Sequence, residues 1–138
     1  MNNNELSYYR LALLSFLKDN HPDLFSDGDF VSERVELAIA TYTDCRKDGF
    51  DHSQAEALAN TNLFNGLQFS KYNTLKKIIW EEFEQEIDND ILTTELLPQC
   101  DEIFSQYELN DEFSYTAKFD QLYKELTGTV LIWLENEF

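Results

Sequence analysis

The two histidines are the first place to look for metal or acid–base chemistry. His21 and His52 are the only histidines in the chain. A carboxylate-bridged di-metal site in a helical bundle needs Glu-x-x-His on two helices, so that both ligands face inward one turn apart. The residues three positions before the histidines are Lys18 and Gly49, which cannot act as such ligands. The sequence therefore argues against a di-iron centre and predicts no metal site and no cofactor.

The segment Asp44–Gly49 resembles the start of a calcium-binding loop, with acids at positions 1 and 5 and glycine at position 6. Position 3 is Arg46, however, and position 12, which should be a bidentate glutamate, is Ala55. A cation there would meet a guanidinium group instead of a carboxylate. We interpret the segment as a helix C-terminus, where Arg46 and Lys47 complement the helix dipole.

Asp51, His52 and Ser53 are the residue types of a catalytic triad. Consecutive residues cannot place their side chains in the required relay, so we interpret Ser53 as a helix cap and His52 as a surface residue. The chain contains no G-x-S-x-G elbow, no phosphate-binding glycine loop and no H-E-x-x-H motif. We therefore expect a protein that is not an enzyme. The alternative is an enzyme whose site is assembled from dispersed Asp, Glu and Tyr residues.

Two neighbouring predicted helices with a glycine in their connection also suggest a helix-turn-helix. The candidate recognition helix, residues 53–65, contains neither lysine nor arginine. Phosphate neutralisation by basic side chains supplies most non-specific affinity for DNA. We therefore expect no direct nucleic-acid binding.

The net charge of −17 is concentrated in the second half of the chain. Residues 1–77 have a net charge of −3, whereas residues 78–138 hold 16 acids and only two bases, Lys118 and Lys124, a net of −14. A field of that sign repels nucleic acids and anionic membranes and attracts basic proteins. The charge pattern predicts a basic protein partner.

One predicted helix carries its charges against its own dipole. Lys71, Lys76 and Lys77 lie near its start, and acids follow toward its end. On this helix, a row along one face would consist of Lys77, Glu81, Glu84 and Asp88. The acids form either a solvated outer face or an acidic docking surface for a partner. The candidate docking surface consists of seven residues: Glu81, Glu84, Asp88, Asp101, Glu102, Asp111 and Glu112.

The cysteines and the N-terminus indicate a cytoplasmic protein. Cys45 and Cys100 lie far apart without C-x-x-C spacing, so reduced thiols are expected. The first residues lack the basic start and apolar run of a signal peptide. The longest apolar run, Val130–Leu134, is too short to span a bilayer, so no membrane association is expected. A homo-oligomer is compatible with these features.

The elements that would position these residues are all helical. With 4 Gly and 2 Pro, the chain has little material for the many turns of a β-sandwich or barrel. Apolar spacing predicts three helices in the first half of the chain. The first covers residues 5–20, and the second lies between a turn at residues 27–29 and Gly49. The third begins at a capping box of Ser53 and Glu56 and ends at Gly66. We expect Asp27 or its neighbours to cap the second of these.

Three further helices are predicted in the second half. One is capped by Ser70 and extends to Ile87, one starts between Thr94 and Leu97 because of Pro98, and one follows the loop at residues 108–114. The last contains an ambiguous segment, residues 127–134, whose β-branched residues around Gly128 also suit a short strand. We favour a helix there, with Gly128 at a point of close helix packing. The predicted fold is an all-α, single compact orthogonal bundle of about six helices, with one domain over residues 1–138.

Several segments together resemble a known family: residues 9–17 leading to His21-Pro22-Asp23-Leu24, residues 66–72, and residues 122–130 with 132–135. The chain is similar to small helical proteins with a domain of unknown function from Bacteroidales-type bacteria, which are often encoded on conjugative or other mobile elements. The resemblance covers nearly the whole chain. It implies an all-helical fold and a cytoplasmic accessory role, and it supplies no catalytic residues.

The function predicted from these observations is that of a non-enzymatic interaction protein, which binds a basic protein partner through its acidic C-terminal half. A sharper variant is a DNA mimic that inhibits a nucleic-acid-binding protein, which would require carboxylates in two tracks spaced like duplex phosphates.

Overall fold

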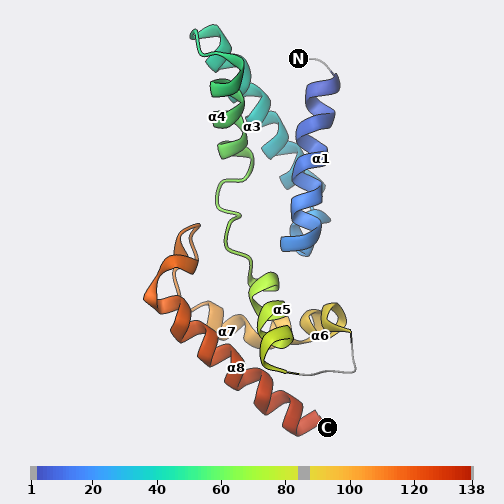
Figure 1. Cartoon of the computed structure of the whole chain (residues 1–138). Coiled ribbons are helices and arrows are strands. Elements are labelled where there is room, and N and C mark those ends of the chain that lie inside the picture. The colour runs from blue at the N-terminus through green and yellow to red at the C-terminus, as the bar shows by residue number, and fades with distance from the viewer. Residues whose placement is uncertain (1–2, 84–87, 138) are drawn as a thin grey trace. The chain divides into compact units, whose positions relative to one another are not determined.

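The computed structural model describes residues 3–83 and 88–137, and all regular structure within those ranges is helical (Figure 1). The prediction of an all-α fold is confirmed. The chain divides into two compact units, Met1–Leu67 and Gln68–Phe138, and each has its own cluster of buried apolar side chains. This division does not test the expectation of one domain over residues 1–138, which stays a prediction.

The described part of the first unit contains α1 (Asn3–Asn20), α2 (Pro22–Phe25), α3 (Gly28–Lys47) and α4 (His52–Leu63). The first helix ends at His21-Pro22 as predicted, because the residue before a proline is pushed out of the helical region. Pro22 then begins the short second helix, where its missing N–H costs nothing. His21 Nε2 donates to the Leu67 carbonyl oxygen at 2.8 Å, which ties this corner to the end of the unit.

Helices α3 and α4 begin at aspartate caps. Asp27 accepts a hydrogen bond from the Phe30 amide, as the turn at residues 27–29 led us to expect. The predicted box of Ser53 and Glu56 is wrong by two positions, since Asp51 and Gln54 form the reciprocal bonds instead. Asp51 has an extended backbone that a cap requires, whereas Ser53 already lies inside the helix.

Burial in the first unit follows the apolar stripes of its helices. Its buried cluster consists of Tyr9, Leu13, Leu17, Val31, Val35, Ala38, Ile39, Ala59, Leu63 and Leu67. Gly49, between α3 and α4, has a φ of 98°, a left-handed conformation that L side chains rarely adopt. It ends α3 as predicted.

The described part of the second unit contains α5 (Lys71–Glu82), α6 (Asn89–Leu96), α7 (Asp101–Phe104) and α8 (Ala117–Glu137). Two short 3₁₀ helices lie at Leu97–Cys100 and Phe113–Tyr115. Ser70 caps α5 as predicted, accepting from the Asn73 amide at 3.0 Å.

The predicted continuation of α5 to Ile87 is wrong. The helix ends at Glu82, and Phe83 has an extended backbone with φ −135° and ψ 135°. Residues 84–87, and with them Glu84 and Ile87, lie outside the described residues. Asp88 then caps α6 by accepting from the amides of Asp90 and Ile91. Carboxylates are unfavourable at a helix C-terminus and favourable at an N-terminus. This explains why Asp88 begins a new helix instead of ending α5.

The single helix that was expected to start between Thr94 and Leu97 is not formed. The structure has α6, which starts earlier at Asn89 and ends at Leu96, followed by a 3₁₀ helix and α7. Pro98 lies at the start of the 3₁₀ helix Leu97–Cys100, where no hydrogen bond from its nitrogen is required. Beyond it, Cys100 and Phe104 are fully buried.

The ambiguous segment 127–134 is helical and belongs to α8. The hydroxyls of Thr127 and Thr129 donate back to the carbonyl oxygens of Tyr123 and Glu125, at 2.8 and 3.0 Å. Such bonds accommodate threonine inside a helix. Close packing at Gly128 is wrong, however, because a Cβ added there would meet nothing within 4 Å.

The core of the second unit joins α5, α6 and α8. Its buried residues are Phe69, Leu75, Ile78, Ile79, Leu92, Leu96, Cys100, Phe104, Phe113, Leu122, Leu126 and Val130. Around Phe113, the rings of Phe69, Tyr107 and Phe119 pack edge-on at centroid distances of 5.2 to 6.2 Å. Among the described residues, no helix combines the length and the apolar character needed to cross a bilayer.

Candidate functional site

The acidic residues of the predicted docking surface are spread over several elements of the second unit. Glu84 lies outside the described residues. The others lie at the end of α5, at the cap of α6, on α7 and in the segment before the second 3₁₀ helix: Glu81, Asp88, Asp101, Glu102, Asp111 and Glu112. The predicted row of Lys77, Glu81, Glu84 and Asp88 along one helix is not formed, because α5 ends before Asp88.

Three of these acids make bonds that hold the unit together. Glu81 accepts from the Tyr123 hydroxyl at 3.0 Å and lies 3.9 Å from Lys77 Nζ. Asp88 caps α6, and Asp111 accepts from the Gln68 amide at 3.0 Å. These carboxylates therefore have a structural role, whatever else they do.

Asp101, Glu102 and Glu112 are the predicted acids whose side chains are exposed and for which no such structural bond is described. Asp101 and Glu102 occupy the first turn of α7, where carboxylates suit the helix dipole. Among the described residues of the predicted surface, these three combine an exposed carboxylate with the absence of such a structural bond, which leaves them available for contact with a basic partner.

Tyrosine and carboxylate side chains meet at two places between helices of this unit. Tyr123 on α8 lies 3.0 Å from Glu81 and 2.8 Å from Glu82, at the end of α5. Burial and the two carboxylates raise the pKa of this phenol far above its usual value, because both disfavour a negative phenolate. The contact joins residues more than 40 positions apart and fixes the end of α5 against α8.

The second meeting point joins α5 to α6 through Asp90. Its carboxylate accepts from the Tyr72 hydroxyl at 2.8 Å and pairs with Lys76 Nζ at 2.6 Å. Hydrogen bonds from Lys76 and Tyr72 hold the Asp90 pKa below its usual value. Burial, together with the bond to Asp90, raises the Tyr72 pKa to about 12. At neutral pH, Asp90 is therefore a carboxylate that accepts a hydrogen bond from the neutral Tyr72 phenol.

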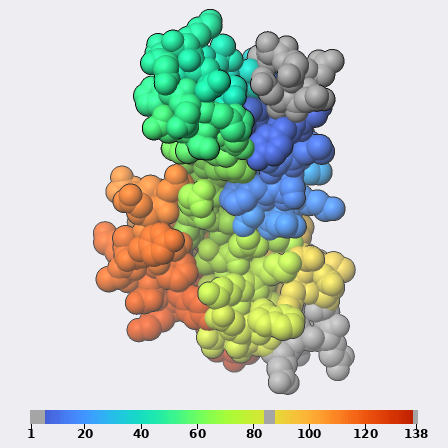
Figure 2. Space-filling view, turned by 45° about the horizontal axis from the view of Figure 1, so that its top comes forward, coloured from blue at the N-terminus to red at the C-terminus, as the bar shows by residue number. Residues whose placement is uncertain are grey.

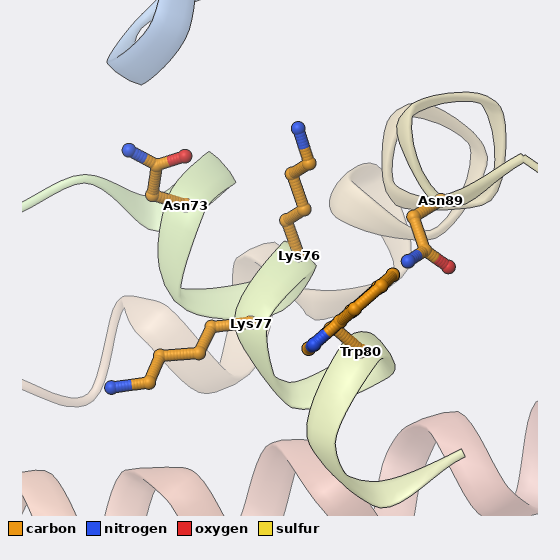
Figure 3. A pocket seen from close by; sticks show the side chains of 5 residues that line it. All are labelled: Asn73, Lys76, Lys77, Trp80 and Asn89. Carbon is orange, nitrogen blue, oxygen red and sulfur yellow. The ribbon is translucent and has the colours of Figure 1, made fainter. Parts of the chain in front are cut away.

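Next to this network lies an open hollow of about 430 Å³ on the outer face of α5 and the start of α6 (Figure 3). Asn73, Lys76, Lys77 and Trp80 line it from α5 at helical spacing, and Asn89 lines it from α6. The Trp80 ring lies next to Asn89, while the two lysines leave α5 in different directions (Figure 3). The yellow-green α5 and the yellow α6 are adjacent at the surface of the unit (Figure 2).

The sequence reasoning missed three residues of this hollow, Asn73, Trp80 and Asn89, and Trp80 is the aromatic one among them. Its side chain is 74% exposed, although tryptophan is usually well covered in a monomeric protein. The signal was present in the spacing: Ile78 and Ile79 are buried with Leu75, and Trp80 lies off that apolar stripe. An aromatic residue off the buried face of a helix is typical of interaction sites.

In the first unit, His52 makes contacts that the triad pattern did not predict. Its Nδ1 lies 2.8 Å from the Tyr42 hydroxyl, and its Nε2 lies 2.9 Å from Glu56. Neither Asp51, which caps α4, nor Ser53 is among these partners. The His52 side chain is 67% exposed, in agreement with its interpretation as a surface residue.

No group of three or more His, Cys, Asp and Glu side chains within the described ranges could hold a metal ion. The predicted calcium-like stretch is helix over Asp44–Lys47, followed by the Asp48 cap and Gly49. Arg46 donates to the Phe50 carbonyl oxygen at 3.2 Å, a helix-terminal role like the one predicted for it.

Comparisons with known proteins place the chain in a family. The family described as "Domain of unknown function (DUF1896)" matches residues 1–138. The chain belongs to this family.

A crystal structure of protein PG0816 from Porphyromonas gingivalis is similar, with a TM-score of 0.88 and 34% identity over 97% of this chain and 93% of that one. Comparison with curated proteins finds no match. The resemblance to a Bacteroidales family is confirmed to this extent, and the association with mobile elements stays a prediction.

Proposed function

We propose that this member of the family is a non-enzymatic accessory protein whose second unit binds a basic protein partner. The observation that carries the proposal is the net charge of −14 over residues 78–138. Within that stretch, Asp101, Glu102 and Glu112 present exposed carboxylates.

An acidic surface of this kind acts mainly on the rate and selectivity of association. Complementary charges steer encounters and suppress partners of the same sign. At physiological ionic strength the field extends over a Debye length of about 8 Å, so the partner must approach closely before the attraction is strong. Binding should therefore weaken steeply with added salt.

The environment of the tyrosines supports a non-enzymatic role. A tyrosine that acts as a base or nucleophile needs a lowered pKa, so that phenolate forms near neutral pH. Burial, together with the carboxylate partners of Tyr72 and Tyr123, raises the phenol pKa instead. These contacts stabilise helix packing and do not activate the phenols.

The distribution of the acids favours a protein partner over the alternative of a DNA mimic. A mimic needs carboxylates arranged in two tracks like duplex phosphates. The described acids of the predicted surface are divided among α5, α6, α7 and a loop, and three of them hold structural bonds. The free thiols of Cys45 and Cys100 support placement in a reducing compartment such as the cytoplasm.

The test compares two variants with the same change in net charge. In the first, Asp101→Asn, Glu102→Gln and Glu112→Gln are combined. In the matched control, the exposed acids of the first unit are changed instead, as Asp19→Asn, Glu33→Gln and Glu36→Gln. Each protein is used to capture partners from host lysate at about 0.05 M and about 0.5 M salt.

We expect capture of a basic protein by the wild type and the control at low salt, and its loss at high salt. The first variant should lose most of this capture. Equal capture by both variants, or no salt-sensitive partner of the wild type, would contradict the proposal.

A further inference from the structure

We propose that the hollow beside Trp80 binds a small aromatic anion, meaning a planar ring that carries a phosphate or carboxylate group. This site is distinct from the acidic surface and does not depend on the protein partner. The residues of its lining that the structure describes supply an exposed indole, two amides, two ammonium groups and no carboxylate. Within an acidic chain, such a lining selects an anion.

The indole provides the platform for the ring. Trp80 is 74% exposed, and its ring lies against Asn89 at the mouth of the hollow (Figure 3). A planar ligand that stacks on this face would cover apolar surface that is otherwise in water. Aromatic stacking tolerates many ring types, so the ring itself is only loosely specified.

The two lysines provide the charge. Lys76 Nζ is held 2.6 Å from Asp90, and an ammonium group has three donors, so this pair leaves donors for a ligand. The Lys77 side chain is 65% exposed, and its ion pair within the described part of the chain is a long 3.9 Å contact to Glu81. Its side chain points away from Trp80 in Figure 3, but its flexible four-carbon stem can turn toward an anion in the hollow.

The wall of the hollow is already in place without a ligand. Tyr72 and Lys76 on α5 both bond to Asp90 on α6, which fixes the two helices at the point where Asn89 faces Trp80. Asp88, the N-cap of α6, also fixes the start of that helix. A preformed site loses less conformational entropy on binding than one that must be ordered.

Size and charge favour a small ligand over a polymer. A volume of about 430 Å³ is within the usual range of small-molecule sites. A nucleic acid would bring many further phosphates against the acids of residues 78–138, which hold only two bases. A single anionic group needs only the remaining donors of Lys76 and the weakly engaged ammonium group of Lys77.

The experiment follows the two indole N–H signals in NMR spectra of the full chain. The protein contains two tryptophans, Trp80 and Trp133, and the Trp133→Phe variant assigns the signals. Four probes are used in neutral and anionic pairs: adenosine with adenosine monophosphate, and benzamide with benzoate. Each is added up to about 5 mM, above the dissociation constant of about 1 mM expected for a few favourable contacts.

We expect the Trp80 signal to shift saturably with at least one anionic probe, while the Trp133 signal stays in place. Preference for the monophosphate identifies a nucleotide-type ligand, and preference for benzoate identifies an aromatic acid. Either result supports the proposal if the neutral counterpart binds several-fold more weakly. Equal binding of neutral and anionic probes overturns it, and so does the absence of any Trp80 shift.

Variants test the two groups separately, with the backbone amide signals of the hollow as the readout. Trp80→Ala should weaken binding at least about tenfold, because it removes the stacking platform. Lys77→Gln should weaken it about two- to fivefold, the usual effect of one exposed charge. Lys124→Gln, the same change at an exposed lysine outside the hollow, should have no effect. Equal affinities of the two lysine variants would overturn the assignment of charge to the hollow.

Discussion

Replacing Gly128 by alanine should stabilise the protein. Gly128 lies inside α8, its φ is not positive, and an added Cβ would meet nothing within 4 Å. In the unfolded chain, glycine has more conformational freedom than alanine, so it loses more conformational entropy when the helix forms. The substitution therefore removes unfolded-state entropy and adds no steric contact in the folded state.

The expected gain is about 1 kcal/mol, the difference between glycine and alanine in a helix interior. At the entropy of unfolding typical of proteins, this raises the midpoint of thermal unfolding by about 3 °C if all 138 residues unfold together. If the second unit unfolds by itself, the smaller entropy gives a rise of about 7 °C. Calorimetry on the wild type and Gly128→Ala therefore measures the gain and also reports whether the two units unfold as one.

Gly66→Ala is the matched control. Its added Cβ would also meet nothing within 4 Å, but Gly66 has a φ of 78°. An L side chain in that left-handed conformation costs about 1–2 kcal/mol, so this variant should be less stable than the wild type. If Gly128→Ala is neutral or destabilising, the reasoning that α8 runs with open space past residue 128 is refuted.

Three further predictions concern ionisation. Asp90→Asn should weaken the link between α5 and α6 at neutral pH. Because the folded-state pKa of Asp90 is lowered, its stabilisation is present above the unfolded pKa of about 4 and is lost as the pH falls through the folded pKa. The urea midpoints of wild type and variant should therefore converge in acid. Tyr72→Phe should remove from the ultraviolet titration a phenol that ionises near pH 12. Because this pKa is raised, the stabilisation by Tyr72 is present below a pH of about 10 and is lost toward pH 12. Burial raises the Cys100 pKa to about 11, so a thiol reagent should modify Cys45 in the folded protein and reach Cys100 only on unfolding, and equal rates would contradict the buried position.

Features with a local cause could be predicted from the sequence. Ser70 and Asp27 cap helices as expected, and Gly49 ends α3, because each depends on neighbouring residues only. The continuation of α8 through Thr129 could also be predicted, since no partner strand was present in the chain.

The boundary between α5 and α6 could not be predicted because two local signals compete there. The apolar spacing of Ile79, Phe83 and Ile87 continues the helix, while Asp88 offers a strong cap for a new one. Periodicity alone does not decide between them. The error placed Glu81 and Asp88 in one helical row, and that row carried part of the argument for the docking surface.

The hollow and the tyrosine–carboxylate contacts depend on tertiary structure. Tyr123 meets Glu81 and Glu82 across more than 40 residues of sequence, and no local pattern encodes such a meeting. Trp80 could be identified as a site residue only once its exposure was known, because an aromatic residue in a small helical protein is usually part of the core.

Carboxyl footprinting of the captured complex tests the central claim most directly. Exposed carboxylates are labelled with a carbodiimide and an amine in the free protein and in the complex, and mass spectrometry measures the change at each residue. The account predicts protection at Asp101, Glu102 and Glu112 in the complex, with unchanged labelling at Glu33 and Glu36 of the first unit. Unchanged labelling at those three residues, with protection confined to the first unit, would contradict the account.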